Sequence, residues 1–142
     1  MTVKRVAKTE NAHNYCDMST IFSKIIAGEI PSYKLVETEC SFAFLDIHPE
    51  SVGHTLIVPK VEVDQWFEVP DEYYLDVMRL AKHIAPALMQ VTGASRIFTK
   101  IIGTDVPHFH LHLIPYKPSL LEGASLEVIA REIKGLLSHA KN

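Results

Sequence analysis

The chain has 142 residues, of which 47% are hydrophobic and 22% are charged. This length is typical of a single domain, and the composition excludes a disordered, collagen-like or low-complexity protein. Fourteen basic residues against seventeen acidic ones give a formal net charge of −3. Because the chain lacks the basic surplus that binds phosphate backbones, we expect no nucleic-acid partner.

The sequence shows no membrane or export segment. No apolar run approaches the roughly 18 residues that span a bilayer, and residues 1–17 lack the apolar stretch of a signal peptide. We therefore expect a soluble, cytoplasmic protein without a membrane partner. The two cysteines, Cys16 and Cys40, form no Cys-x-x-Cys pair and are expected to be unpaired thiols.

The first half of the chain predicts a polar arm, one short helix and three strands. Residues 1–17 show no apolar period and are expected to form a mobile arm, which leaves 18–142 as a single domain. Between Ser19 and Gly28 the apolar residues recur at helical spacing, and Gly28 is a suitable stop. Apolar runs between turn residues predict strands at 33–37, 42–47 and 55–58.

The second half predicts a long helix, two strands and a terminal helix. One apolar face persists from Asp71 to Gly93, although Pro86 lies inside it and is expected to bend or split the helix. Strands at 96–102 and 108–114 and a helix at 126–137 follow. The strands come in consecutive groups, which favours an antiparallel α+β fold with one long helix, a short N-terminal helix and a C-terminal helix.

A row of histidines is the most informative feature of the sequence. His108, His110 and His112 alternate with apolar residues, so on a strand the three imidazoles share one face while the apolar side chains enter the core. With eight histidines in 142 residues, such a triplet arises by chance in about 2–3% of sequences. The pattern therefore indicates a functional site.

Two chemistries are compatible with this row. A His-x-His pair chelates metals, and a hydrolytic zinc site would recruit a further ligand, for which Asp105 or His54 is available. Alternatively, a neutral imidazole attacks phosphorus and forms a covalent phospho-histidine. Imidazoles about 6.7 Å apart would repel by roughly 2.5 kcal/mol if both were charged, at an effective dielectric of about 20. At least one therefore stays neutral near pH 7, as a nucleophile must.

The sequence resembles the histidine-triad (HIT) family in four ordered blocks. They read IFSKIIAGEIP at 21–31, AFLDIHP at 43–49, GHTLIVPK at 53–60 and HFHLHL at 108–113. Within the family the likeness is strongest to Hint-like nucleotide-binding proteins, which are small nucleoside phosphoramidases. The resemblance implies a HIT-like fold with a sheet of about five strands, a purine nucleotide substrate, a homodimer, and no metal or other cofactor.

The resemblance also implies roles for four histidines. His110 would attack the α-phosphorus and become nucleotidylated, while its other nitrogen donates to a backbone carbonyl. His112 would contact the α-phosphate. His108 and His54 would complete the polar group around the nucleophile.

The same resemblance places a nucleotide beside these histidines. Asp46 would accept hydrogen bonds from the ribose hydroxyls, and the backbone N–H groups near Asp105 and Val106 would face the phosphate oxygens. An apolar cleft would hold the base, lined by Ile21, Phe22, Ile25, Phe44, Leu45 and Ile47.

The chain departs from the family pattern just before the triad. Many relatives have Gly-Gln-Ser or Gly-Gln-Thr there and an Asn-containing loop upstream, whereas 103–105 read Gly-Thr-Asp. A carboxylate at Asp105 is unfavourable beside a phosphate unless it turns away, pairs with Lys100 or meets a positively charged substrate. One hypothesis is selectivity for a cationic amine or aminoacyl leaving group.

Two further departures concern a metal and an aromatic residue. Zinc-bearing relatives have two cysteines and a histidine where this chain has Thr20, Ser23 and Glu62, so that structural zinc is expected to be absent. Trp66 matches no motif and is expected in the core or in a dimer contact.

These observations predict a nucleotide hydrolase or transferase. It would cleave at the α-phosphate of purine nucleoside phosphoramidates or aminoacyl adenylates through a covalent nucleotidyl-histidine. Hydrolysis of dinucleoside polyphosphates is an alternative, because the chemistry at the α-phosphorus is the same. A nucleotide-binding interaction protein with little turnover and a metal-dependent hydrolase are the other two alternatives.

Overall fold

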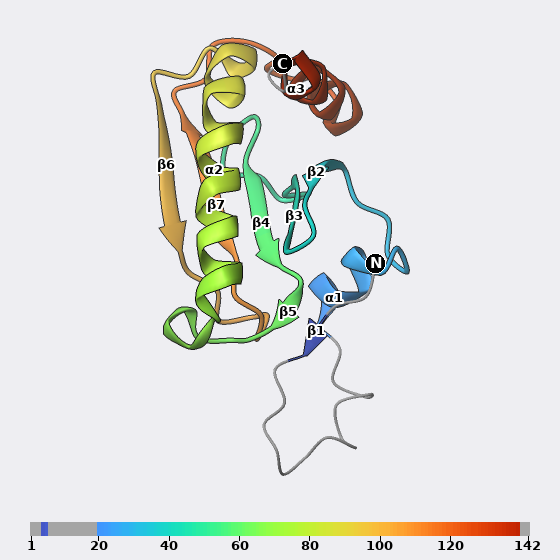
Figure 1. Cartoon of the computed structure of the whole chain (residues 1–142). Helices are drawn as coiled ribbons and strands as arrows, with labels where there is room; N and C mark the ends of the chain where they lie inside the picture. The colour runs from blue at the N-terminus through green and yellow to red at the C-terminus, as the bar shows by residue number, and fades with distance from the viewer. Residues whose placement is uncertain (1–3, 6–19, 140–142) are drawn as a thin grey trace.

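The computed structural model describes residues 4–5 and 20–139 (Figure 1). Along the chain its elements are β1 (Lys4–Arg5), α1 (Ile21–Ile26), β2 (Lys34–Glu37), β3 (Ser41–Leu45), β4 (Thr55–Pro59), β5 (Val61–Glu62), the 3₁₀ helix η2 (Trp66–Glu68), α2 (Asp71–Thr92), β6 (Arg96–Ile101), β7 (Leu111–Tyr116) and α3 (Leu126–His139). The predicted α+β class, with three helices on a five-stranded antiparallel sheet, is confirmed.

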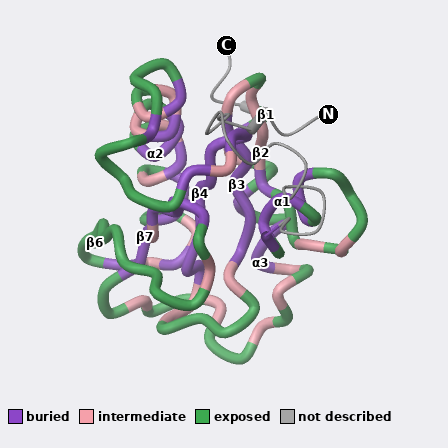
Figure 2. Tube along the Cα trace, turned by 90° about the horizontal axis from the view of Figure 1, so that it is seen from below, coloured by how far each residue is buried: buried purple, intermediate pink, exposed green. Residues whose placement is uncertain are grey.

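The sheet has the strand order β2-β3-β4-β7-β6, and all four pairings are antiparallel. Helix α2 crosses one face of the sheet, and α3 packs against α2 and β2 (Figure 1). The main core lies between α2, α3 and this face. Figure 2 shows the central strands β3 and β4 as buried, whereas most connecting loops are exposed.

The opposite face of the sheet carries a smaller apolar cluster under α1. Thr20 caps this helix, because its hydroxyl accepts a hydrogen bond from the Ser23 backbone N–H at 3.1 Å. The side chains that α1 buries there are Phe22, Ile25 and Ile26, which pack with Phe42, Phe44, Leu56 and Val58 of the two central strands. This second cluster forms the apolar floor of the site described below.

Helix α2 runs without interruption through Pro86, so the predicted splitting does not occur. Pro86 and Lys82, whose carbonyl loses its i+4 donor, both lie on the exposed side of the helix, where water can satisfy that carbonyl. The helix ends at Gly93, which adopts φ 67° and donates its N–H to the Met89 carbonyl.

The strand predicted at 108–114 begins three residues later than expected. Pairing with β4 and with β6 starts at Leu111, whereas the Phe109 N–H bonds to the Val63 carbonyl at 2.6 Å, beyond the end of β4. The side chains still alternate, because Phe109, Leu111 and Leu113 all enter the main core. The histidines therefore share a face, although only His112 lies within the strand.

Most of the predicted mobile arm, 1–3 and 6–17, lies outside the described residues. The exception is β1, which pairs in parallel with β5. Cys16 also lies outside them. Within the described part of the chain, no helix has the length and apolar character to cross a bilayer.

Candidate functional site

A pocket of about 470 Å³ lies between α1, the ends of β3 and β4, and the loop before the triad. It collects every residue predicted to bind the nucleotide, namely Ile21, Phe22, Ile25, Phe44, Leu45, Asp46, Ile47, Asp105 and Val106, together with His110 and His112. Leu45 borders it through its backbone, because its side chain belongs to the main core on the other face. Residues that are distant in sequence thus meet at one cavity.

His110 is held in one tautomer at this wall. Its Nδ1–H donates to the His108 carbonyl at 2.8 Å, the bond expected from the sequence. Nε2 is therefore left with its lone pair, and it faces Gly103, where an added Cβ would lie 2.5 Å from it. The ring also packs edge-on against Phe22, with centroids 4.8 Å apart. Burial lowers the pKa of His110, which favours the neutral ring at pH 7.

His54 and His112 form a hydrogen-bonded pair beside His110. The Glu50 backbone N–H donates to His54 Nδ1 at 3.0 Å, which assigns the ring proton of His54 to Nε2. Nε2–H donates to His112 Nδ1 at 2.9 Å, and His112 Nε2–H donates to the Ile102 carbonyl at 2.8 Å. Burial lowers the pKa of His54. The His54 ring is consequently neutral, the hydrogen bonds fix both rings, and His112 holds the loop that precedes the triad.

The same two rings and Asp46 have a spacing that suits a metal ion, with candidate ligand atoms within 4.8 Å of one another. The hydrogen bonds do not suit it. His54 Nδ1 accepts a hydrogen bond from Glu50, so Nε2 carries the proton and has no lone pair for a metal. Coordination of a metal by His54 Nε2 would require the ring proton to move to Nδ1, which would break the hydrogen bond from the Glu50 N–H. These side chains therefore fit a chain of hydrogen-bonded imidazoles and not a metal centre.

His108 lies below the pocket and does not line it. It is 1% exposed, its Nε2–H donates to the Pro59 carbonyl at 2.9 Å, and its Nδ1 accepts from the Thr20 hydroxyl at 2.8 Å. Burial lowers its pKa, in keeping with a neutral ring. The structure thus brings His108 to the site as a buried link between α1 and the triad, with both ring nitrogens occupied.

Zinc-bearing relatives have their metal ligands at the positions of Thr20, Ser23 and Glu62. In this chain these three residues lie close to His108. Ser23 donates its hydroxyl to the Glu62 carboxylate, and its backbone N–H bonds to the same Thr20 hydroxyl that reaches His108. Hydroxyl groups engaged in this way are poor substitutes for the thiolates of a structural zinc site. The residues present fit a hydrogen-bond network and not a tetrahedral zinc.

Asp105 and Lys100 do not pair in the way that was considered from the sequence. Lys100 forms an exposed ion pair with Glu50 at 2.7 Å, whereas Asp105 is exposed at the rim of the nucleotide pocket. Lys100 lies in β6 opposite His112, so its ion pair with Glu50 joins the loop between β3 and β4 to β6 beside the two histidines.

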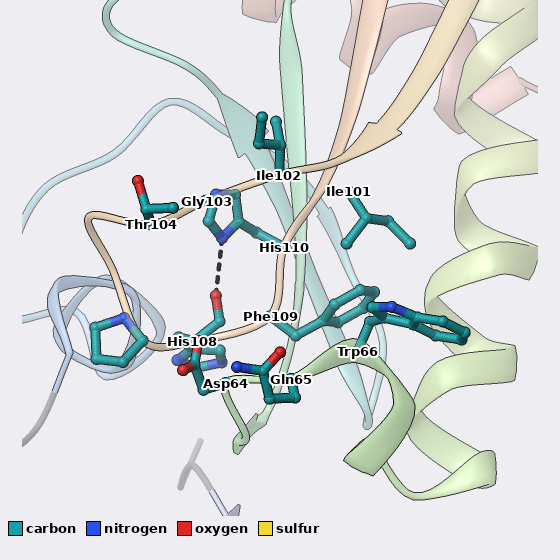
Figure 3. A pocket seen from close by; sticks show the side chains of 11 residues that line it. Asp64, Gln65, Trp66, Ile101, Ile102, Gly103, Thr104, His108, Phe109 and His110 are labelled. Carbon is teal, nitrogen blue, oxygen red and sulfur yellow. Dashed lines mark hydrogen bonds between the residues drawn. The ribbon is translucent and has the colours of Figure 1, made fainter.

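A second cavity, of about 370 Å³, touches the other side of the triad (Figure 3). It is bordered by Asp64, Gln65 and Trp66 and by the same His110. Sequence reasoning missed these three, because no motif marks the loop after β5. Trp66 is 51% exposed, so the prediction that it lies in the core of the chain was wrong.

Sequence comparison identifies relatives of this chain. A model of the HIT domain family matches residues 27–119. Adenosine 5'-monophosphoramidase HNT1 of Saccharomyces cerevisiae is 45% identical over 100 residues, which cover 70% of this chain and 63% of that enzyme. Adenosine 5'-monophosphoramidase hnt1 of Schizosaccharomyces pombe is 38% identical over 131 residues, covering 84% of this chain and 93% of that enzyme.

The fold has equally clear counterparts among solved structures. A zinc-bound histidine triad family protein from Mycobacterium smegmatis superposes with a TM-score of 0.77 at 28% identity, covering 87% of this chain and 96% of that one. The family match covers the three imidazoles and the part of the pocket that follows α1. The chain therefore belongs to the HIT domain family.

Proposed function

We propose that this protein is a purine nucleoside phosphoramidase that works through a covalent nucleotidyl-His110. The observation that carries the proposal is the tautomer of His110. Its Nδ1–H donates to the His108 carbonyl, which leaves the lone pair on Nε2, and the ring lines an apolar pocket. The two yeast relatives named as adenosine 5'-monophosphoramidases support the same chemistry.

The nucleotide would lie in the pocket with its base among the apolar side chains of α1 and β3. Asp46, at the end of β3, has one carboxylate oxygen on the His48 N–H at 2.8 Å and the other 3.6 Å from His54 Nε2. The lone pairs that remain on this carboxylate can accept both ribose hydroxyls. The α-phosphate would then lie beside His110 and His112.

The reaction then needs two displacements at phosphorus. The Nε2 lone pair of His110 attacks the α-phosphorus, the phosphorus–nitrogen bond breaks, and the departing amine takes up a proton from solvent. Water next attacks the same phosphorus and loses a proton. The bond between phosphorus and His110 then breaks, and its electron pair returns to Nε2. The backbone N–H groups near Val106 stabilise the charge on the phosphoryl oxygens, while His112, through its bond to the Ile102 carbonyl, positions the loop that carries them.

The test compares AMP release from adenosine phosphoramidate by wild type, His110→Ala and His83→Ala. His83 lies on α2, away from both cavities, and serves as the matched control. We expect His110→Ala to lose at least about a thousandfold in kcat/KM and His83→Ala to retain full activity. Acid-quenched wild type should also carry a covalent AMP adduct that His110→Ala lacks. Equal release from all three proteins would exclude the assigned nucleophile.

Nucleotide binding with little turnover is a second candidate function. It is favoured by the exposed Asp105 at the pocket rim, where family members have a hydroxyl, because a carboxylate opposes the phosphate charge. The adduct assay separates the two functions. AMP that binds the protein in calorimetry, with neither adduct nor product from the phosphoramidate, would select this one.

We also propose that two copies of the chain pair along β6. This strand is an edge of the sheet, and its Phe98 and the neighbouring Tyr116 form a ring pair with centroids 4.9 Å apart. Both rings are exposed, by 44% and 40%, and an open apolar edge is a natural pairing surface. Light scattering should give the mass of a dimer for wild type and of a monomer for Phe98→Glu. A monomeric wild type would refute the pairing.

A further inference from the structure

The tautomer of His110 depends on a single peptide unit. Its Nδ1–H donates to the His108 carbonyl at 2.8 Å, the bond that is dashed in Figure 3. The Phe109 N–H belongs to the same planar peptide unit and donates to the Val63 carbonyl at 2.6 Å. The position of the His110 ring therefore depends on where the chain holds residue 108.

Three further hydrogen bonds hold His108 in place. Its backbone N–H donates to the Val106 carbonyl at 2.8 Å, and its ring Nε2–H donates to the Pro59 carbonyl at 2.9 Å. Its ring Nδ1 accepts from the Thr20 hydroxyl at 2.8 Å. Two of these partners are backbone carbonyls, which any residue at those positions would supply. The bond from Thr20 is the one that depends on the identity of a side chain.

The proton of the Thr20 hydroxyl favours one tautomer of the His108 ring. With this donor, Nδ1 keeps its lone pair and Nε2 carries the proton that bonds to the Pro59 carbonyl. Without it, either Nδ1 or the Pro59 carbonyl loses its partner. Both Thr20 and His108 are buried, so water cannot readily replace the hydroxyl. We expect the ring, and residue 108 with it, to shift.

Thr20 also belongs to the helix that lines the nucleotide pocket. It is the N-cap of α1, whose apolar side chains border that pocket. The Phe22 ring of α1 packs edge-on against two imidazoles, with its centroid 5.9 Å from that of His108 and 4.8 Å from that of His110. The first turn of α1 therefore contacts the triad both by packing and through the Thr20 hydrogen bond.

We propose that Thr20 is a positioning residue for the nucleophile: its hydroxyl holds the His108 ring, and the His108 carbonyl in turn keeps His110 in the tautomer that leaves Nε2 free. This inference rests on the proposed function, in which His110 attacks phosphorus. Thr20 lines neither cavity. Its loss should therefore slow the chemical step more than it weakens nucleotide binding.

The experiment measures kcat and KM for adenosine phosphoramidate at a temperature where circular dichroism shows each variant to be folded. Thr20→Val keeps the shape of the side chain without its proton, and we expect kcat to fall about 5- to 50-fold with KM nearly unchanged. Thr20→Ser keeps the hydroxyl and should retain at least about half of the wild-type kcat. Thr20→Cys has a weaker donor and should lie between the two, which keeps the test open if the valine variant does not fold.

Ser23→Ala is the matched control. It removes the neighbouring buried hydroxyl of α1, which donates to Glu62, and leaves both the Ser23 N–H and the bond from Thr20 to His108 in place. This variant should lose stability but keep kcat within about twofold of wild type. It therefore separates a loss of stability from a loss of positioning.

Nitrogen-15 NMR of the imidazoles gives a readout that does not depend on turnover. In wild type, His110 should show the Nδ1–H tautomer and His108 the Nε2–H tautomer. Thr20→Val should change the signals of both rings towards a mixture of tautomers, whereas Ser23→Ala should change neither.

Three results would overturn the positioning role: a wild-type kcat in Thr20→Val with unchanged ring signals, an equal loss of kcat in Thr20→Ser, or an effect on KM alone. Failure of the proposed function gives a different result. If His110→Ala keeps full activity, His110 is not the nucleophile, while the ring signals of Thr20→Val still show whether Thr20 holds the tautomer of His110.

Discussion

Replacement of Thr20 by valine tests the link between α1 and the triad. The Thr20 hydroxyl accepts from the Ser23 N–H at 3.1 Å and donates to His108 Nδ1 at 2.8 Å, and its oxygen also lies 3.1 Å from the Ser23 hydroxyl. Valine has nearly the same shape but can make neither bond. Thr20 is 8% exposed and His108 is 1% exposed, so water cannot readily replace the lost partner.

The expected cost follows from these two bonds. Loss of a helix N-cap costs about 1 kcal/mol, and a buried ring nitrogen without a donor costs about 1–3 kcal/mol. Thr20→Val should therefore lower the free energy of unfolding by about 2–4 kcal/mol. Thr20→Ser keeps both bonds and removes one methyl group, so it should cost only about 0.8 kcal/mol.

Urea unfolding followed by circular dichroism gives the free energies of both variants, and hydrogen exchange at the Ser23 amide reports whether α1 frays first. The valine variant should unfold at lower urea than the serine variant and should exchange the Ser23 amide faster. If the two variants have the same stability to within about 0.5 kcal/mol, the hydroxyl does not stabilise the link and the reasoning is wrong.

Three further predictions follow from the packing and burial of the imidazoles. Gly103→Ala puts a methyl group 2.5 Å from His110 Nε2 and should lower kcat/KM about 5- to 100-fold, while Gly135→Ala, with nothing within 4 Å, should add about 0.5–1 kcal/mol of stability at an unchanged rate. Because burial lowers the pKa of His110 from its ordinary 6.5, the acid limb of kcat/KM should have its midpoint below pH 6.5, and a midpoint above 6.5 would contradict this. Burial lowers the pKa of His54 and His108 as well. Below pH 6.5 these three rings therefore bind more protons in the unfolded chain than in the folded chain. The free energy of unfolding should then fall from pH 7.5 to 5.5, by up to about 1.4 kcal/mol per pH unit for each ring, and equal urea midpoints at the two pH values would refute it.

Much of the fold could be predicted from local pattern. Helix α2 was placed to within a residue at either end, because its apolar period and the glycine that follows it are strong local signals. The two-residue strand β5 and the short helix η2 were missed, because elements of two or three residues have no period to detect. The start of β7 was set too early, since pairing with both neighbouring strands, and not the alternation of side chains, decides where a strand begins.

The candidate site, like the fold, was predicted from the sequence only in part. The residues predicted to bind the nucleotide came from the resemblance to a known family, and the structure brings them to one cavity. Asp64 and Trp66 were not found, because a loop between two motifs acquires its place only when the Phe109 N–H ties that loop to the triad. His108 had the right position but its surroundings could not be foreseen, since its partner Thr20 lies 88 residues away along the chain.

The sequence by itself determined the spacing of the imidazoles, the amphipathic helices and the alternation that sends Phe109 and Leu111 into the core, because each depends on the geometry of a few neighbouring residues. Only the tertiary structure decided which nitrogen of each ring holds its proton. A ring's tautomer is fixed by the donor or acceptor opposite it, and those partners, such as the Glu50 N–H on His54, come from elsewhere in the folded chain. Hence His110 could be proposed as the nucleophile from sequence, while the free lone pair on its Nε2 and the second cavity beside it could not be foreseen.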